Sequence, residues 1–201
     1  EAHELMAANN NLLLPGSGNP VVTPKLYIVL GCFWMTKAID KDLGEGKMFS
    51  TPNQAITAYD FGQVGFRSKI KLLPGAHAKY DVFAGKVFET TVGRLLFNAV
   101  FPNDFPYLNH EITGTELSAI IEDLIARYGT AKTPEVLDKI KAFGYKYITK
   151  SGITWGIDDL QTPPEKEGLV LAAQAEAQKI EENYAEGLIS ENERYRMSIE
   201  I

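Results

Sequence analysis

The side chains of this chain that could do chemistry are few and widely spaced. Asp158 and Asp159 form a conspicuous carboxylate pair, but adjacent carboxylates on a strand or loop point apart. No third acidic residue or histidine follows within a few positions, as a hard-cation site with several oxygen ligands would need. We therefore expect Asp158 and Asp159 to be structural or capping residues of a turn.

The remaining reactive residues also lack the spacing of a site. The three histidines, His3, His77 and His110, do not form a metal-binding face, and no serine or cysteine nucleophile comes with an obvious base. Cys32 is expected to be a small buried residue. The glycines at 16–18 and 44–46 complete no phosphate-binding motif. The sequence predicts no catalytic residue, metal or cofactor within the chain.

Three polar residues could still make functional contacts. Arg94 follows Val92-Gly93, where the backbone can approach another segment closely, so its guanidinium could bind a carboxylate, a phosphate or a backbone carbonyl. An intramolecular clamp is the alternative. Asn10 and Asn11 have amides that suit an irregular loop, with a functional contact also open.

Composition restricts the class of protein. The 201 residues are 45% hydrophobic, enough to bury a core in one domain or two small ones. The net charge of −6 gives no sign of the basic surface that independent nucleic-acid binding needs. A single cysteine excludes a disulfide framework and a cysteine-based zinc site, and no run of 18 apolar residues exists. We expect a cytoplasmic protein without membrane contact.

The fold class predicted is α+β, with a mixed N-terminal half and an all-helical C-terminal half. Residues 2–13 have a helical pattern, 28–35 are apolar and ambiguous, 52–60 suit a helix, and 66–72 and 80–88 suit strands. Capping sequences at Thr51, Thr113, Thr133, Thr162 and Ser190 mark helix starts. We expect C-terminal helices near 114–128, 134–147, 164–186 and 191–201, with stops at Gly129 and Gly187.

The last two helices should pair as an acidic antiparallel hairpin. Residues 162–201 contain nine Glu and four basic residues, so the hairpin carries −5 of the total charge. The expected apolar seam is formed by Ala173, Ala177, Ile180 and Tyr184, with Leu188, Tyr195 and Ile199 returning along it. Both ends of the chain fall inside helical patterns, so we expect an excerpt of a longer protein.

Four segments carry a family resemblance. They are Thr90-Thr91-Val92-Gly93-Arg94-Leu95-Leu96-Phe97-Asn98 with Phe101-Pro102, Asn10-Asn11-Leu12-Leu13 with Pro15, Gly18, Pro20 and Pro24, Gly44-Glu45-Gly46 with Phe49, and Ser151-Gly152-Ile153-Thr154-Trp155-Gly156-Ile157-Asp158-Asp159-Leu160. In this order they resemble the β′ subunit of bacterial DNA-directed RNA polymerase. The resemblance spans nearly the whole chain.

The resemblance implies a place within that enzyme. Residues 1–110 would be the end of a pore-like α+β region, and 111–201 a funnel-like helical region with a rim hairpin at 164–201. This excerpt would form the wall of the secondary channel for nucleotide entry. The family's reaction is nucleotidyl transfer with Mg²⁺ ions held by an Asp-rich loop. That loop is absent here, so the excerpt alone would not be catalytic.

The resemblance also implies partners and site residues. The partners would be the β, α and ω subunits, Gre-type or DksA-like secondary-channel factors, and DNA and RNA only through the complete enzyme. Glu193 and Glu200 match acidic positions that such factors touch, and Tyr195 lies between them. Asn10, Asn11, Arg94, Asp158 and Asp159 would be channel or structural residues.

Some residues depart from the family pattern. Lys25-Leu26-Tyr27 stands where Ser-Gln-Asp is usual, and Arg196-Met197 where Asn-Lys is usual, so contacts of those groups, including an alarmone site, are not carried over. A stand-alone helical-hairpin adaptor that binds another protein, unrelated to transcription, is the alternative interpretation.

Overall fold

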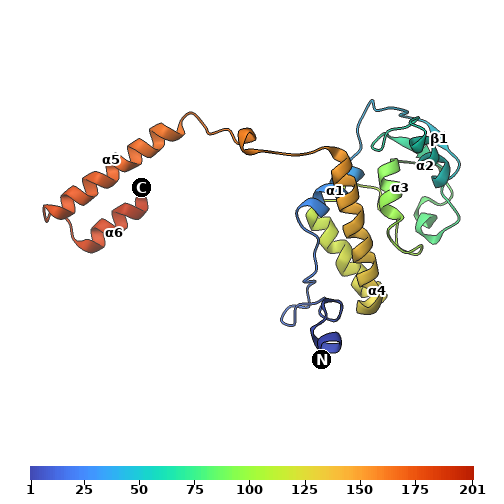
Figure 1. The fold of residues 1–201 in the computed structure, drawn as a ribbon, viewed down its shortest axis with the longest axis horizontal. Helices are drawn as coiled ribbons and strands as arrows, with labels where there is room; N and C mark the ends of the chain where they lie inside the picture. The colour runs from blue at the N-terminus through green and yellow to red at the C-terminus, as the bar shows by residue number, and fades with distance from the viewer. The chain divides into compact units, whose positions relative to one another are not determined.

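The computed structural model describes residues 1–201 and has an α+β fold, as expected. The chain forms two compact units, Glu1–Ile153 and Thr154–Ile201. Figure 1 shows their elements in chain order. The division of the chain at residue 110 into a pore-like and a funnel-like region stays a prediction.

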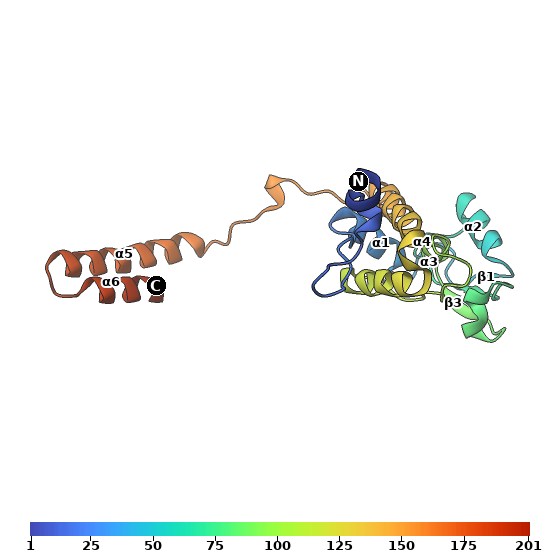
Figure 2. The same cartoon turned by 90° about the horizontal axis from the view of Figure 1, so that it is seen from below.

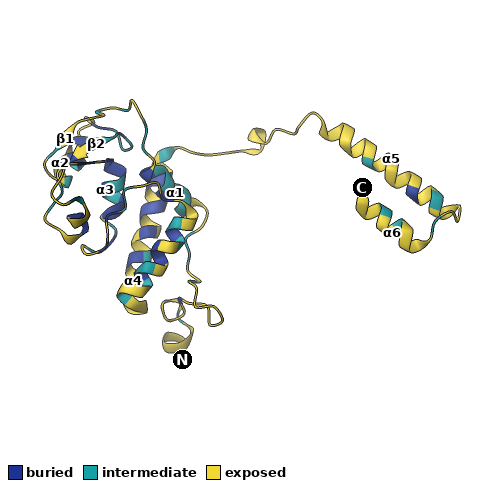
Figure 3. Cartoon of the chain, turned by 180° about the vertical axis from the view of Figure 1, so that it is seen from behind, coloured by how far each residue is buried: buried dark blue, intermediate teal, exposed yellow.

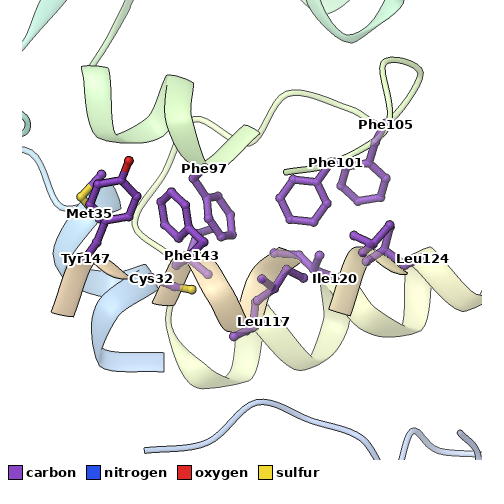
Figure 4. Close-up of a cluster of buried hydrophobic side chains, with 13 residues drawn as sticks. Cys32, Met35, Phe97, Phe101, Phe105, Leu117, Ile120, Leu124, Phe143 and Tyr147 are labelled. Atoms are coloured by element: carbon purple, nitrogen blue, oxygen red, sulfur yellow. The ribbon is translucent and has the colours of Figure 1, made fainter. Parts of the chain in front are cut away.

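Unit 1 is built on the packing of two helices, α1 (Tyr27–Thr36) and α4 (Gly114–Ser151). The ambiguous apolar run at 28–35 is therefore helical. It can be apolar on several sides because α4, α3 (Val92–Asn98) and neighbouring loops contact it. Figure 4 shows the resulting core, in which Phe97 of α3 and Phe101 and Phe105 of the following loop lie over α4, which contributes Phe143.

Helix α4 corresponds to two predicted helices joined at a kink. Gly129 has φ 71° and ψ 176°, a conformation that L-residues with side chains rarely adopt. The stop predicted at Gly129 is confirmed. Thr133 does not start the next helix, because helical structure resumes directly after Gly129 and the Thr133 hydroxyl donates to the Gly129 carbonyl at 2.7 Å.

A three-stranded sheet packs with two short helices to form a second core in unit 1. Its strands are β1 (Met48–Phe49), β2 (Ile70–Leu72) and β3 (Phe88–Thr90), in that order. Strand β1 is parallel to β2 with Met48 opposite Lys71, and β3 is antiparallel to β2 with Phe88 opposite Leu72. Helix α2 (Pro52–Asp60), at the predicted position, and α3 contribute the other core residues.

The strand expected over residues 80–88 is wrong. A 3₁₀-helix runs from Ala78 to Phe83, and only Phe88 begins a strand. Ala84 and Gly85 both have positive φ, which turns the chain so that the Phe83 ring stacks on Phe88 at 3.7 Å between centroids. Residues 2–13 are likewise less regular than expected, with a π-helix at Ala2–Met6 and a 3₁₀-helix at Ala8–Asn10.

Three predicted helix caps are confirmed, and two, at Thr133 and Thr162, are wrong. The hydroxyls of Thr51, Thr113 and Ser190 accept hydrogen bonds from the backbone three residues on. By contrast, Thr162 caps nothing, because two consecutive prolines delay the start of α5 (Lys166–Ala185).

Unit 2 consists of an extended segment with a 3₁₀-helix at Ile157–Asp159, followed by α5 and α6 (Glu191–Glu200). The two helices pack as the expected hairpin, turning at Gly187, where φ is 74°. Figure 2 shows the two helices side by side, and Figure 3 shows that most of their residues are exposed. No helix in either unit is long and apolar enough to cross a membrane.

The expected seam of the hairpin is wrong on the α6 side, and on the α5 side Ala177 and Tyr184 are exposed as well. Tyr195 and Ile199 are 69% and 66% exposed, and Leu188 is exposed too. Ile180 of α5 is buried as expected, but Arg194 and Met197 are the half-buried residues of α6. Arg194 donates to Glu181 at 2.6 Å and lies 5.0 Å from the Tyr184 ring. This pairing turns the face with Arg194 and Met197 toward α5.

Candidate functional site

Backbone contacts hold the segment around Arg94 in place. Thr91 caps α3, and the Gly93 N–H donates to the Phe66 carbonyl at 2.8 Å. A Cβ added to Gly93 would lie 2.0 Å from the Met35 carbonyl oxygen. The close backbone approach predicted at Gly93 is therefore present, and it fixes where Arg94 begins.

The Arg94 guanidinium joins three segments of unit 1. Its Nε donates to the Thr36 carbonyl at 2.9 Å, at the end of α1. Its Nη1 donates to the carbonyl of Asn109 at 2.9 Å and to that residue's side-chain oxygen at 3.3 Å. Burial lowers the pKa of Arg94. The sequence left a carboxylate, a phosphate or a backbone carbonyl open as the ligand of Arg94. The structure places backbone carbonyls within reach of its guanidinium.

Two polar residues that the sequence analysis did not single out complete this arrangement. The Asn98 amide donates to the carbonyls of Arg94 and Leu108 and accepts from the Leu108 N–H, each at 2.8 Å. The Thr36 hydroxyl accepts from the Ile112 N–H at 2.9 Å. Asn98 ends the resembling segment, which could have pointed to it, but nothing in the sequence marks Thr36.

Lys79 is a third residue that the sequence did not reveal. Only 7% exposed, it donates to the carbonyls of Asn98 at 3.0 Å and Phe101 at 3.5 Å, near the end of α3. Burial lowers its pKa, although the nearby Asp104 opposes this shift. A cation here offsets the partial negative charge of the last carbonyls of the helix.

Asn10 and Asn11 contact the N-terminal π-helix. The Asn10 amide donates to the carbonyls of His3 at 2.9 Å and Glu4 at 3.1 Å, and the Asn11 amide donates to Leu5 at 2.8 Å and Ala7 at 3.0 Å. Both residues are exposed. Their amide N–H groups satisfy backbone carbonyls that the short helix leaves without partners.

Asp158 and Asp159 lie in the exposed 3₁₀-helix of unit 2. Asp159 accepts from the Gly156 N–H at 2.7 Å, which is a capping contact. No three His, Cys, Asp or Glu side chains anywhere in the chain are arranged to hold a metal ion.

Glu193 has a local structural partner on the hairpin. Its carboxylate accepts from the Ser190 backbone N–H at 2.9 Å and from the Ser190 hydroxyl at 2.8 Å. These hydrogen bonds lower the pKa of Glu193. A substitution that removes the side-chain acceptor of Glu193 therefore acts on the start of α6 as well as on surface charge.

Glu200 and Tyr195 lie elsewhere on α6. Glu200 borders a hollow of about 350 Å³ between α5 and α6, together with Ile180, Asn183 and Met197. Its carboxylate lies 4.0 Å from Arg196. Tyr195 is exposed, and its side chain forms no hydrogen bond within the chain. The hairpin thus offers an acidic surface with an exposed aromatic ring. In unit 1, the predicted residues Arg94, Asn10 and Asn11 are not joined by any hydrogen bond.

Comparison with known proteins assigns the family. The profile described as RNA polymerase Rpb1, domain 3, matches residues 11–160, so the chain belongs to this family. The chain is similar to proteins named DNA-directed RNA polymerase subunit beta′. It is 40% identical to that of Thermoanaerobacter sp. (strain X514), over 99% of this chain and 18% of the relative. It is 41% identical to that of Desulforamulus reducens, over 100% of this chain and 16% of the relative.

The resemblance to bacterial β′ subunits is thereby confirmed, and it continues past the domain match through the hairpin. The chain spans less than a fifth of the length of these relatives. Similarity over both units leaves the stand-alone adaptor without support.

Proposed function

We propose that the chain works within the β′ subunit of a DNA-dependent RNA polymerase, a nucleotidyltransferase. Unit 1 forms part of the wall of the secondary channel through which nucleotides enter, and the hairpin docks Gre-type or DksA-like factors. The similarity at 40–41% identity across both units is the observation that supports this proposal.

The chain's own residues would contribute shape and not catalysis. Arg94, Asn98 and Thr36 hold the end of α1, α3 and the segment at 108–112 in one arrangement. Asp158 and Asp159 do not fit a Mg²⁺ site, because Asp159 accepts a backbone hydrogen bond and no third ligand is near. In this proposal the catalytic Mg²⁺ ions, the β, α and ω subunits and the nucleic acids are bound by the complete enzyme.

The docking role follows from charge and exposure on the hairpin. Nine Glu against four basic residues in 162–201 would attract a basic factor and speed its encounter. Tyr195, 69% exposed, would supply an aromatic contact next to this charge. Glu200 borders the hollow between the helices, where a side chain of the factor could insert.

The test uses the complete polymerase that contains this chain. Glu200→Lys should weaken factor binding by about two- to tenfold, with a smaller effect at high salt, because an exposed charge is screened. Glu193→Gln should also weaken binding while it keeps the cap, because Gln can replace Glu there. Elongation without the factor should not change.

Glu122→Lys is the matched control, because Glu122 is an exposed residue of unit 1 without an ion pair and the charge change is the same. Unchanged affinity in both hairpin variants, or an equal loss of factor-free elongation, would remove the docking role.

A further inference from the structure

A group of aromatic and basic side chains on unit 1 takes no part in the contacts described above. Its members come from α1, α2, the loop before β2 and the last turns of α4. We call it the cation–aromatic cluster, and it consists of Trp34, Tyr59, Phe66, Arg67, Lys146, Tyr147 and Lys150.

Phe66 is the centre of this cluster. Its ring centroid lies 3.8 Å from Tyr59, 5.6 Å from Tyr147 and 6.1 Å from Trp34. Tyr147 is buried in the core, whereas Trp34, Tyr59 and Phe66 are half-buried and reach the surface. The four rings therefore form one connected group from four separate parts of the chain, and three of them reach the surface.

The three cations of the cluster are positioned over these rings. The Arg67 guanidinium lies 4.7 Å from the Trp34 ring, Lys150 Nζ lies 5.8 Å from both Phe66 and Tyr147, and Lys146 Nζ lies 5.3 Å from Tyr147. Lys146 and Lys150 are four residues apart and share one face of α4. Contact with a ring fixes a cation without using its N–H donors.

None of these three cations has a carboxylate partner or a side-chain hydrogen bond. By contrast, Lys139 and Lys141, earlier on α4, pair with Glu135 and Asp138. Asp60 is the carboxylate that affects the pKa of the tyrosines in the cluster. Burial is the larger cause that raises the pKa of Tyr147, and the charge of Asp60 is the smaller one. Asp60 forms no ion pair, so the donors of Arg67 and both lysines stay available.

The overall charge of the chain hides this patch. Of the net −6, −5 lies in residues 162–201, so the rest of the chain is nearly neutral. A cluster of unpaired cations can therefore create a locally positive surface on an acidic protein.

We propose that the cation–aromatic cluster binds the phosphate backbone of a single-stranded nucleic acid. Cations held at several points along a row of rings match successive phosphates, and the edges of Trp34 and Tyr59 can contact unpaired bases. Binding is weak and independent of sequence, with a Kd on the order of 1–100 µM at low salt. The inference does not depend on the docking role of the hairpin.

The test measures Trp34 fluorescence in the 201-residue chain with Trp155→Phe, which leaves Trp34 as the only tryptophan. The probe is a 12-residue oligo(dT), with Mg-ATP as a second titrant because a free nucleotide has the same phosphate chemistry. Oligo(dT) should quench Trp34, and log Kd should rise with log salt with a slope of about 2, as expected for three cations on a single strand.

Replacing two of the cations should abolish most of this binding. Arg67→Gln with Lys150→Gln should raise the Kd at least about tenfold, because two charge-assisted contacts are lost. Lys86→Gln with Lys132→Gln removes the same charge from exposed positions outside the cluster, and should raise it less than about twofold. Circular dichroism checks that both double variants are folded.

Three outcomes would overturn the proposal. They are the absence of quenching by oligo(dT) in a folded chain, equal losses in the two double variants, and Mg-ATP binding as tight as oligo(dT), which would assign the cluster to a single nucleotide instead.

Discussion

Gly31 of α1 and Gly144 of α4 lie against each other where the two helices cross. A Cβ at Gly31 would be 2.2 Å from the Gly144 carbonyl oxygen, and a Cβ at Gly144 would be 2.8 Å from the Ile28 Cα. No side chain fits between these backbones. The crossing therefore depends on two glycines that are 113 positions apart in the sequence, and it brings Cys32 and Met35 into the core shown in Figure 4.

Gly31→Ala should destabilise unit 1 by about 1–3 kcal/mol or more, since backbone atoms must move apart to admit one methyl group. Urea unfolding followed by circular dichroism measures the change. Gly16→Ala is the control, because a Cβ there meets nothing within 4 Å. Equal stability of the two variants would show that the helices do not cross this closely.

Arg94→Lys should cost about 1–3 kcal/mol of unfolding free energy, because an ammonium group cannot reproduce the guanidinium fork that reaches Thr36 and Asn109. Arg127→Lys should cost less than about 0.5 kcal/mol, as its partner Asp123 is on the surface. Urea unfolding followed by circular dichroism measures both costs. A cost at Arg94 no larger than that at Arg127 would mean that the clamp contributes little.

Cys32 should resist thiol reagents in the folded chain. Burial raises its pKa to about 12, which at pH 8 leaves about a thousandfold less thiolate than an ordinary thiol has. Labelling with a chromogenic disulfide reagent should be slow in buffer and fast in urea. Fast labelling in buffer would contradict the burial of Cys32.

Local features of the fold could be predicted from the sequence. The helix at 52–60, the capping boxes at Thr113 and Ser190, and the stops at Gly129 and Gly187 were all found, because caps and glycine turns depend on neighbouring residues only. The strand at 80–88 was wrong because an alternating pattern does not reveal the turn at Ala84 and Gly85.

Contacts between distant segments could not be predicted. Arg94 was singled out, but its partners Thr36 and Asn109 lie 58 and 15 positions away. On the hairpin, Arg194 pairs with Glu181, and Arg194 and Met197 lie where Tyr195 and Ile199 were expected in the seam. Periodicity identifies an apolar face, but it gives no weight to an arginine that packs on an aromatic ring.

The hairpin should lose helix in acid through Glu193. Its hydrogen bonds with Ser190 lower its pKa below the ordinary value of 4.5. The stabilisation is therefore present above that ordinary value and is lost as the pH falls through the lower, folded-state value. In a peptide of residues 162–201, circular dichroism should show this loss below about pH 4, and Glu193→Gln should reduce it. Glu191→Gln, without the cap contacts, should not, and an identical acid response in the two variants would contradict this assignment.

The most direct test of the central claim is a chimeric polymerase. Residues 1–201 replace the matching segment of the Thermoanaerobacter β′ subunit, and the Desulforamulus segment serves as a matched control. Extension of labelled RNA on a nucleic-acid scaffold is then measured after assembly with the other subunits. The account predicts that both chimeras assemble and elongate RNA at comparable rates. A chimera with this chain that is folded but fails to assemble, while the control chimera works, would contradict it.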